Sequence, residues 1–137
     1  RAITRKILKA HLERNQQPWE SLRKAIIVHL YLSEAMQPWF YFSYMEAKNL
    51  SKKEKAKAVA SELYTEQLFT DILRRGRGEG NFAVRDCRLT ASIIKAMLQD
   101  WYLKRPKYAG RRISVDQYAD FILEMLNAYI TDTGNRQ

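Results

Sequence analysis

Three glycines, Gly76, Gly78 and Gly80, have a spacing that could do chemistry, because glycine-rich loops can hold phosphate groups. Dinucleotide-binding loops follow a strand and open a helix, whereas these glycines come directly after the apolar residues Ile72 and Leu73, at the end of a helical pattern. Glycine is common at that place because it can adopt the left-handed cap conformation. We interpret the three residues as helix caps and predict no cofactor.

The residue types that bind metals or act as nucleophiles are widely scattered. His11, His29 and Cys87 lack the intervals of a zinc site, and a single cysteine excludes an internal disulfide. Asp116 and Asp120 are better explained by an exposed helix face than by a catalytic carboxylate pair. We therefore predict neither a metal site nor an enzyme. For His29 two interpretations stay open, a core histidine and a side chain that faces a ligand headgroup.

Aromatic residues occupy the four successive positions 39–42. In a helix such residues point in all directions, so several neighbours must enclose them or they must line a cavity. Core packing can explain any one of them, but the wider set of soft apolar side chains favours a cavity for an elongated hydrophobic ligand. The predicted ligand-binding residues are His29, Met36, Trp39, Phe40, Tyr44, Tyr64, Leu68, Phe69, Ile94, Met97 and Trp101.

The composition is that of a globular protein, with 137 residues, 46% hydrophobic and 28% charged, and predicts a single folding unit. The longest apolar run, 25–32, is shorter than the roughly 20 residues that cross a bilayer, and no cleavable signal is evident. We expect a cytoplasmic protein that does not insert in a membrane. The net charge of +9 fits either a polyanionic partner or a basic surface without a partner.

Helical periodicity and capping residues predict an all-α bundle of about six helices. Ser51 with Glu54 and Ser114 with Gln117 form capping boxes, and Asp86 is placed to cap the helix that follows it. The region 104–112 is predicted to be a solvated loop. The predicted helices span 1–14, 19–35, 39–50, 51–75, 86–103 and 114–134. Apolar residues cover more than half of the last helix, which is more than its own domain needs and suggests a partner.

This order of helices resembles the C-terminal regulatory domain of TetR-family repressors over the whole chain. The residues that carry the resemblance are Ile72, Leu73, Gly76, Gly80, Phe82, Asp86, Leu89, Ala91, Ser114, Tyr118, Ala119 and Phe121. The resemblance implies a homodimer that pairs through its last two helices and binds a small hydrophobic effector. The dimer interface is expected to include Ile93, Leu98, Tyr102, Tyr118, Phe121, Ile122, Met125 and Tyr129.

No helix-turn-helix precedes Arg1, so the resemblance implies that operator DNA is read only through a missing N-terminal domain. Residues 1–15 are then expected to be the connecting helix, and 16–134 the ligand-binding and dimerisation domain. The segment 41–55 is similar to branches of the family associated with acyl-CoA or other lipid-like effectors. The alternative is a stand-alone helical protein that binds a lipid or RNA on its basic surface.

An acyl-CoA effector would need cations for its phosphates, and two basic clusters could supply them. A solvated rim with no ligand explains these clusters equally well. The residues are Arg74, Arg75, Arg77, Arg85 and Arg88 around the glycines, and Lys104, Arg105 and Lys107 near the other loop.

Overall fold

The computed structural model describes residues 17–131, without the side chains of residues 58, 59, 61 and 62. Within this range every regular element is a helix, which confirms the predicted all-α class. The elements are α2 (Pro18–Ala35), α3 (Gln37–Met45), the 3-10 helix η1 (Glu46–Asn49), α4 (Lys52–Gly78), α5 (Cys87–Leu103), α6 (Arg105–Gly110) and α7 (Val115–Thr131). The predicted connecting helix, 1–15, lies outside the described residues.

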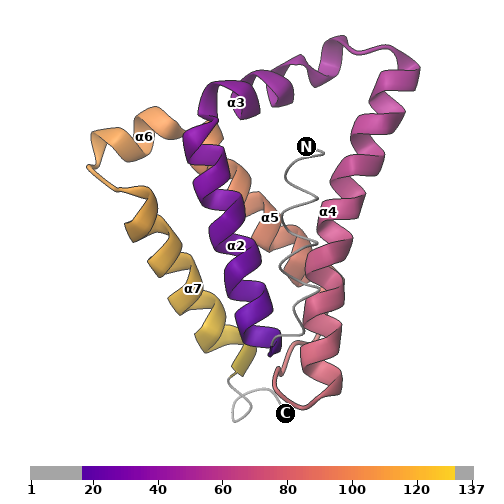
Figure 1. Ribbon diagram of the computed structural model, residues 1–137, viewed down its shortest axis with the longest axis vertical. Helices are drawn as coiled ribbons and strands as arrows, with labels where there is room; N and C mark the ends of the chain where they lie inside the picture. Colours follow the sequence, from indigo (N-terminus) through magenta and orange to yellow (C-terminus); the bar gives the residue numbers. More distant parts are fainter. Residues whose placement is uncertain (1–16, 132–137) are drawn as a thin grey trace.

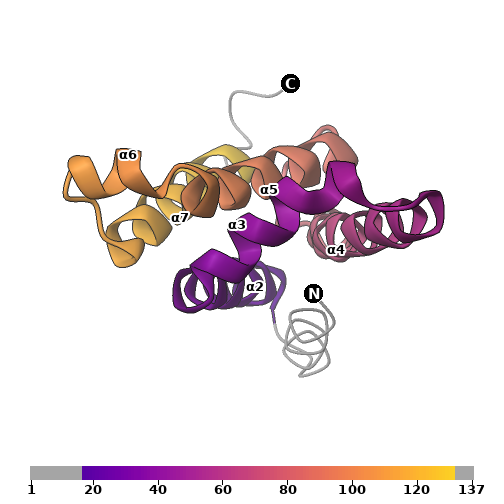
Figure 2. The ribbon, with the colours of Figure 1, turned by 90° about the horizontal axis from the view of Figure 1, so that it is seen from above.

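Helix α2 is the central element, since it contacts α3, α4, α5 and α7 (Figure 1). Helices α4 and α7 lie on either side of α2, and α5 crosses behind it. Helix α3 runs across the upper end of α2 towards α4, so that α3, η1 and the start of α4 form a bend (Figure 2). The chain therefore leaves two outer regions, one along α5 and α7 and one at the bend.

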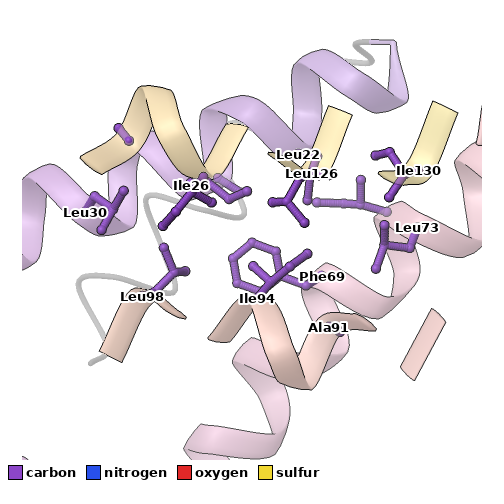
Figure 3. Packing of buried hydrophobic residues seen from close by; sticks show 14 of the residues in the cluster. Leu22, Ile26, Leu30, Phe69, Leu73, Ala91, Ile94, Leu98, Leu126 and Ile130 are labelled. Carbon is purple, nitrogen blue, oxygen red and sulfur yellow. The ribbon is translucent and has the colours of Figure 1, made fainter. Parts of the chain in front are cut away.

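The core lies where α2, α4, α5 and α7 meet, and its apolar side chains interdigitate (Figure 3). Each fully buried Leu, Ile or Phe in such a core contributes roughly 1.5–3 kcal/mol relative to an exposed side chain. The largest members are Leu22, Ile26 and Leu30 of α2, Phe69 and Leu73 of α4, Ile94 and Leu98 of α5, and Leu126 and Ile130 of α7.

The caps predicted at the starts of three helices are confirmed. The Ser51 side chain accepts a hydrogen bond from the backbone N–H of Glu54, whose carboxylate accepts one from the N–H of Ser51. Ser114 and Gln117 form the same reciprocal pair at 3.1 and 2.8 Å. Asp86 accepts from the N–H of Leu89 at 2.9 Å. These local bonds fix where the helices that carry the outer regions begin.

The end of α4 differs from its prediction, because the helix continues through Gly76 to Gly78. Only Gly80 has a left-handed φ, of 82°. The N–H of Gly80 donates to the carbonyl of Arg77 and that of Asn81 to the carbonyl of Gly76, which is a Schellman cap. One glycine of the three is therefore the cap, and Gly76 serves another purpose.

The region 104–112 is not wholly a loop, because residues 105–110 form α6. Proline in the first turn of α6 loses no needed donor. The ring of Tyr108 stacks on Trp101 at 5.3 Å, and its hydroxyl donates to Asp100. Aromatic packing that the local sequence pattern does not reveal explains α6.

The predicted helix 39–50 also differs, since its last turn is the tighter helix η1.

Candidate functional site

The predicted ligand-binding residues do not form one site. Phe69, Ile94 and Trp101 have no exposed surface and belong to the core, so no solvent-sized space adjoins them. His29 and Phe40 are also buried, with their rings edge-to-face at 5.9 Å, and Phe40 meets Tyr102 at 5.3 Å in the same way. These five predicted residues are therefore part of the packed interior and do not line an open site.

Other members of the predicted set lie on or next to α3 and on α4, and they are exposed or half-buried. Trp39, Tyr44 and Tyr64 are exposed, and Met36 and Leu68 are half-buried. Four residues outside the prediction join them, because α3 has one buried large apolar residue and leaves the rest uncovered. We call the exposed set the α3/α4 surface, and its members are Trp39, Tyr41, Phe42, Tyr44, Met45, Leu63 and Tyr64.

A second apolar region lies along α5 and α7, where two grooves of about 720 and 630 Å³ open. Both grooves are lined by Ile93, Met97 and Met125, so they form one continuous feature. Charged side chains lie at its two ends, with Asp100 and Arg111 lining one groove and Arg85 and Asp86 the other. We call this region the α5/α7 face, and its apolar members are Leu89, Ile93, Ala96, Met97, Tyr118, Phe121, Met125 and Tyr129.

The α5/α7 face changes the predicted dimer interface. Leu98 and Tyr102 are buried on the opposite side of α5, towards α2 and α3, and have no surface left for a second copy. Ile122 is buried but lines one groove. The exposed predicted residues are Ile93, Phe121, Met125 and Tyr129, and Tyr118 is half-buried beside them.

Leu89, Ile93, Met97 and Trp101 recur at every fourth residue of α5. A step of four residues turns a helix by about 40° more than a full circle, so the stripe that they form drifts. Leu89 and Ile93 are therefore exposed, Met97 is half-buried and lines both grooves, and Trp101 is in the core. Met97 thus belongs to the α5/α7 face and is separated from the predicted ligand-binding residues of α3. The spacing of Leu89, Ile93 and Ala96, with steps of four and three, was the signal for this face.

Hydrogen bonds hold one end of the α5/α7 face in place. The hydroxyl of Tyr118 donates to the carbonyl of Met97 at 2.6 Å, and Lys107 pairs with Asp100 at 3.0 Å. Burial, together with the hydrogen bond to Tyr108, raises the pKa of the Tyr118 hydroxyl well above its usual value. Tyr118 is thus a neutral donor that joins α7 to α5.

Half of the basic residues proposed for phosphate binding are engaged within the chain. The bonds run from Arg75 to Ser21, from Arg77 to the carbonyls of Val84 and Arg85, from Arg105 to Glu34, and from Lys107 to Asp100. Side chains that are already engaged in this way have fewer free donors for a ligand phosphate.

Among residues 17–131 no group of three His, Cys, Asp or Glu side chains could hold a metal ion. Cys87, at the start of α5, is buried. None of the helices in the described part of the chain is long and apolar enough to cross a membrane.

Comparison with protein families gives one match. The family model described as tetracyclin repressor-like, C-terminal domain, covers residues 15–126. No curated protein and no solved structure matches the chain significantly. The match includes both the α3/α4 surface and most of α7.

Proposed function

The chain belongs to the tetracyclin repressor-like C-terminal domains, and from this premise we propose that it binds a hydrophobic effector at the α3/α4 surface and pairs with a second copy through the α5/α7 face. In this proposal the effector is lipid-like, with an acyl-CoA as the leading candidate. The domain would control an N-terminal helix-turn-helix that binds operator DNA as a repressor.

The observation that carries the proposal is that most of the exposed large apolar side chains lie on two pairs of helices, α3 with α4 and α5 with α7. Single exposed apolar residues are ordinary, but contiguous areas indicate binding sites. Phe42 on α3 is 63% exposed and Phe121 on α7 is 67% exposed, on different elements of the bundle. Two areas match the two tasks of a regulatory domain of this family, which are effector binding and pairing.

The α5/α7 face suits pairing because its centre lacks charge. Ile93, Met97 and Met125 occupy the middle, and charged residues lie at the ends of the grooves. Interfaces between identical subunits have this composition, with an apolar core and a polar rim. In a two-fold arrangement the same face of each copy meets the other, so one apolar face suffices.

The α3/α4 surface suits an elongated apolar ligand. Trp39, Tyr41 and Phe42 offer broad rings, and Met45 is a flexible thioether that adapts to a chain of variable shape. Beneath them Phe40 and His29 are buried and form a rigid base. A ligand bound here would contact α3 and α4 together and favour one arrangement of the two helices.

Transmission to DNA would follow as a population shift. An effector changes an equilibrium only by its different affinities for the two states. We propose that the connecting helix, 1–15, has a different packing in each state and so sets the spacing of two DNA-reading domains.

A thermal-shift series with acyl-CoAs of graded chain length tests the effector proposal. Ligand at 100 times its Kd stabilises the native state by about 3 kcal/mol, which raises the Tm of a domain of this size by roughly 10 °C. We expect the shift to grow with chain length. The absence of any shift across the series would remove the lipid-like effector and leave the family assignment intact.

A further inference from the structure

We propose that the lysines of η1 and of the first turns of α4 bind the phosphates of the effector. The effector is then an acyl group attached to a water-soluble carrier that bears several phosphates. This inference rests on the proposed effector site and adds the residues that would bind the phosphates of its ligand. The cationic residues are Lys48, Lys52, Lys53, Lys55 and Lys57.

All five lysines are exposed, and none takes part in an ion pair with a side chain that the structure describes. The hydrogen bonds with Ser51 lower the pKa of Glu54, and the charge of Lys57 adds to this effect. The two glutamates among them have other partners, since Glu54 closes the capping box with Ser51 and Glu46 accepts from Asn49 at 3.0 Å. Residues 46–57 therefore present a net charge of +3 to solvent.

Helix stability does not explain the position of these lysines. Lys52, Lys53 and Lys55 lie in the first turn of α4, next to the positive end of the helix dipole, where cations are unfavourable. A bound anion would remove this repulsion. Because one carboxylate needs only one cation, a group of five favours a ligand with several phosphates.

The lysines directly follow the aromatic residues of the α3/α4 surface. Helix α3 contacts η1, and η1 contacts α4, so the apolar and cationic parts share one bend of the chain (Figure 2). The arginines around the glycine turn lie at the other end of α4. Lys53 and Arg74 are 21 residues apart on one helix, roughly 32 Å, which exceeds the screening length of about 8–10 Å. A phosphate bound by the lysines is therefore too far from those arginines to interact with their charge.

Isothermal titration with palmitoyl-CoA, below its micelle concentration, tests the inference. The variant Lys52→Gln/Lys53→Gln/Lys55→Gln keeps good helix formers at exposed positions. We expect it to bind palmitoyl-CoA about tenfold more weakly, and free palmitate within twofold of the unchanged protein. The control Arg74→Gln/Arg85→Gln/Arg88→Gln removes the same charge around the glycine turn, at the other end of α4, and is expected to bind palmitoyl-CoA within threefold of the unchanged protein.

Three results would overturn the inference. The first is equal affinity for palmitoyl-CoA and palmitate, with no effect of the lysine variant, which would leave the apolar effector site intact. The second is an equal loss in the control variant. The third is binding to anionic vesicles without binding to monomeric palmitoyl-CoA, which would indicate a lipid surface as the partner. Absence of binding by both acyl compounds would instead contradict the effector proposal itself.

Discussion

The ring of Phe82 lies directly over Gly76, where an added Cβ atom would come within 2.1 Å of Cδ2 of that ring. The chain makes this approach because Gly80 turns the residues after α4 back over the end of the helix. The N–H of Phe82 also donates to the carbonyl of Gly76 at 3.1 Å. Packing, and not an unusual backbone conformation, therefore requires glycine at position 76.

We expect Gly76→Ala to lower the free energy of unfolding by about 1–3 kcal/mol, because the buried ring of Phe82 must move. Gly78 is the control, since no atom lies within 4 Å of an added Cβ there. Gly78→Ala should raise the same quantity by about 0.5–1 kcal/mol through helix propensity. Urea unfolding of both variants measures the difference, and equal effects would contradict the packing argument.

Arg112 has a φ of 57°, a conformation that costs a residue with a side chain roughly 1–2 kcal/mol. We expect Arg112→Gly to raise the free energy of unfolding by about 0.5 kcal/mol after the entropy of glycine is subtracted. Its neighbour Arg111 has an ordinary φ of −87°, so Arg111→Gly should lower the free energy of unfolding by up to about 1 kcal/mol. Urea unfolding should give opposite signs for these two exposed positions, and the same sign would exclude strain at Arg112.

The helix starts were predictable because their signals are local. Ser51 and Glu54 lie three residues apart, and the bond that they form depends on nothing distant. The same holds for the cap at Asp86. The longer helices of the described chain, and hence the all-α class, followed from such signals and from helical periodicity, whereas the short helix α6 did not.

The face that each helix presents was less predictable, because several apolar stripes compete on α5 and α7. Leu98 and Leu89 are equally apolar, yet Leu98 is in the core and Leu89 is 58% exposed. Only the position of α2 and α4 decides between them. In the same way, Trp39 and Phe40 are neighbours in sequence, and one is exposed while the other is buried. The predicted ligand site was for this reason a mixture of core and surface.

Asp100 gives a pH dependence. Burial raises the pKa of its carboxyl, but hydrogen bonds from Tyr108 and Lys107 outweigh burial and leave the pKa below its ordinary value of 3.8. A carboxyl whose pKa is lower in the folded state than in the unfolded state stabilises the fold at pH values above its unfolded-state pKa. This stabilisation is lost as the pH falls through the folded-state pKa. It is therefore present at pH 7 and disappears below about pH 4.

We expect Asp100→Asn to lower the free energy of unfolding at pH 7 by about 1 kcal/mol, a low value because about a third of the side chain is exposed. The deficit should shrink as the pH falls below 4. Asp120→Asn is the control, since Asp120 is an exposed carboxylate of α7 and accepts no hydrogen bond from the described residues. Thermal unfolding from pH 2.5 to pH 7 measures both, and a deficit that does not depend on pH would contradict the role of the charge.

Phe121 and Phe42 offer a matched test of the two apolar areas, because they are 67% and 63% exposed and belong to different areas. We expect Phe121→Asp to convert a dimer into a monomer at micromolar concentration, since two desolvated carboxylates would face the apolar centre of the interface. Phe42→Asp should leave the dimer unchanged. Light scattering coupled to size exclusion measures the mass of each.

The same pair should behave in the opposite way towards ligand. Phe42→Asp places a charge on the α3/α4 surface and should weaken palmitoyl-CoA binding at least tenfold, a loss of about 1.4 kcal/mol. Phe121→Asp should keep its affinity within a few fold, because Phe121 lies on α7 and not among the residues of α3 and α4. If Phe121→Asp abolished both pairing and binding, the effector would lie at the α5/α7 face, whose groove of about 720 Å³ could hold an acyl chain. Opposite effects of two equally exposed phenylalanines would require that pairing and ligand binding use separate surfaces.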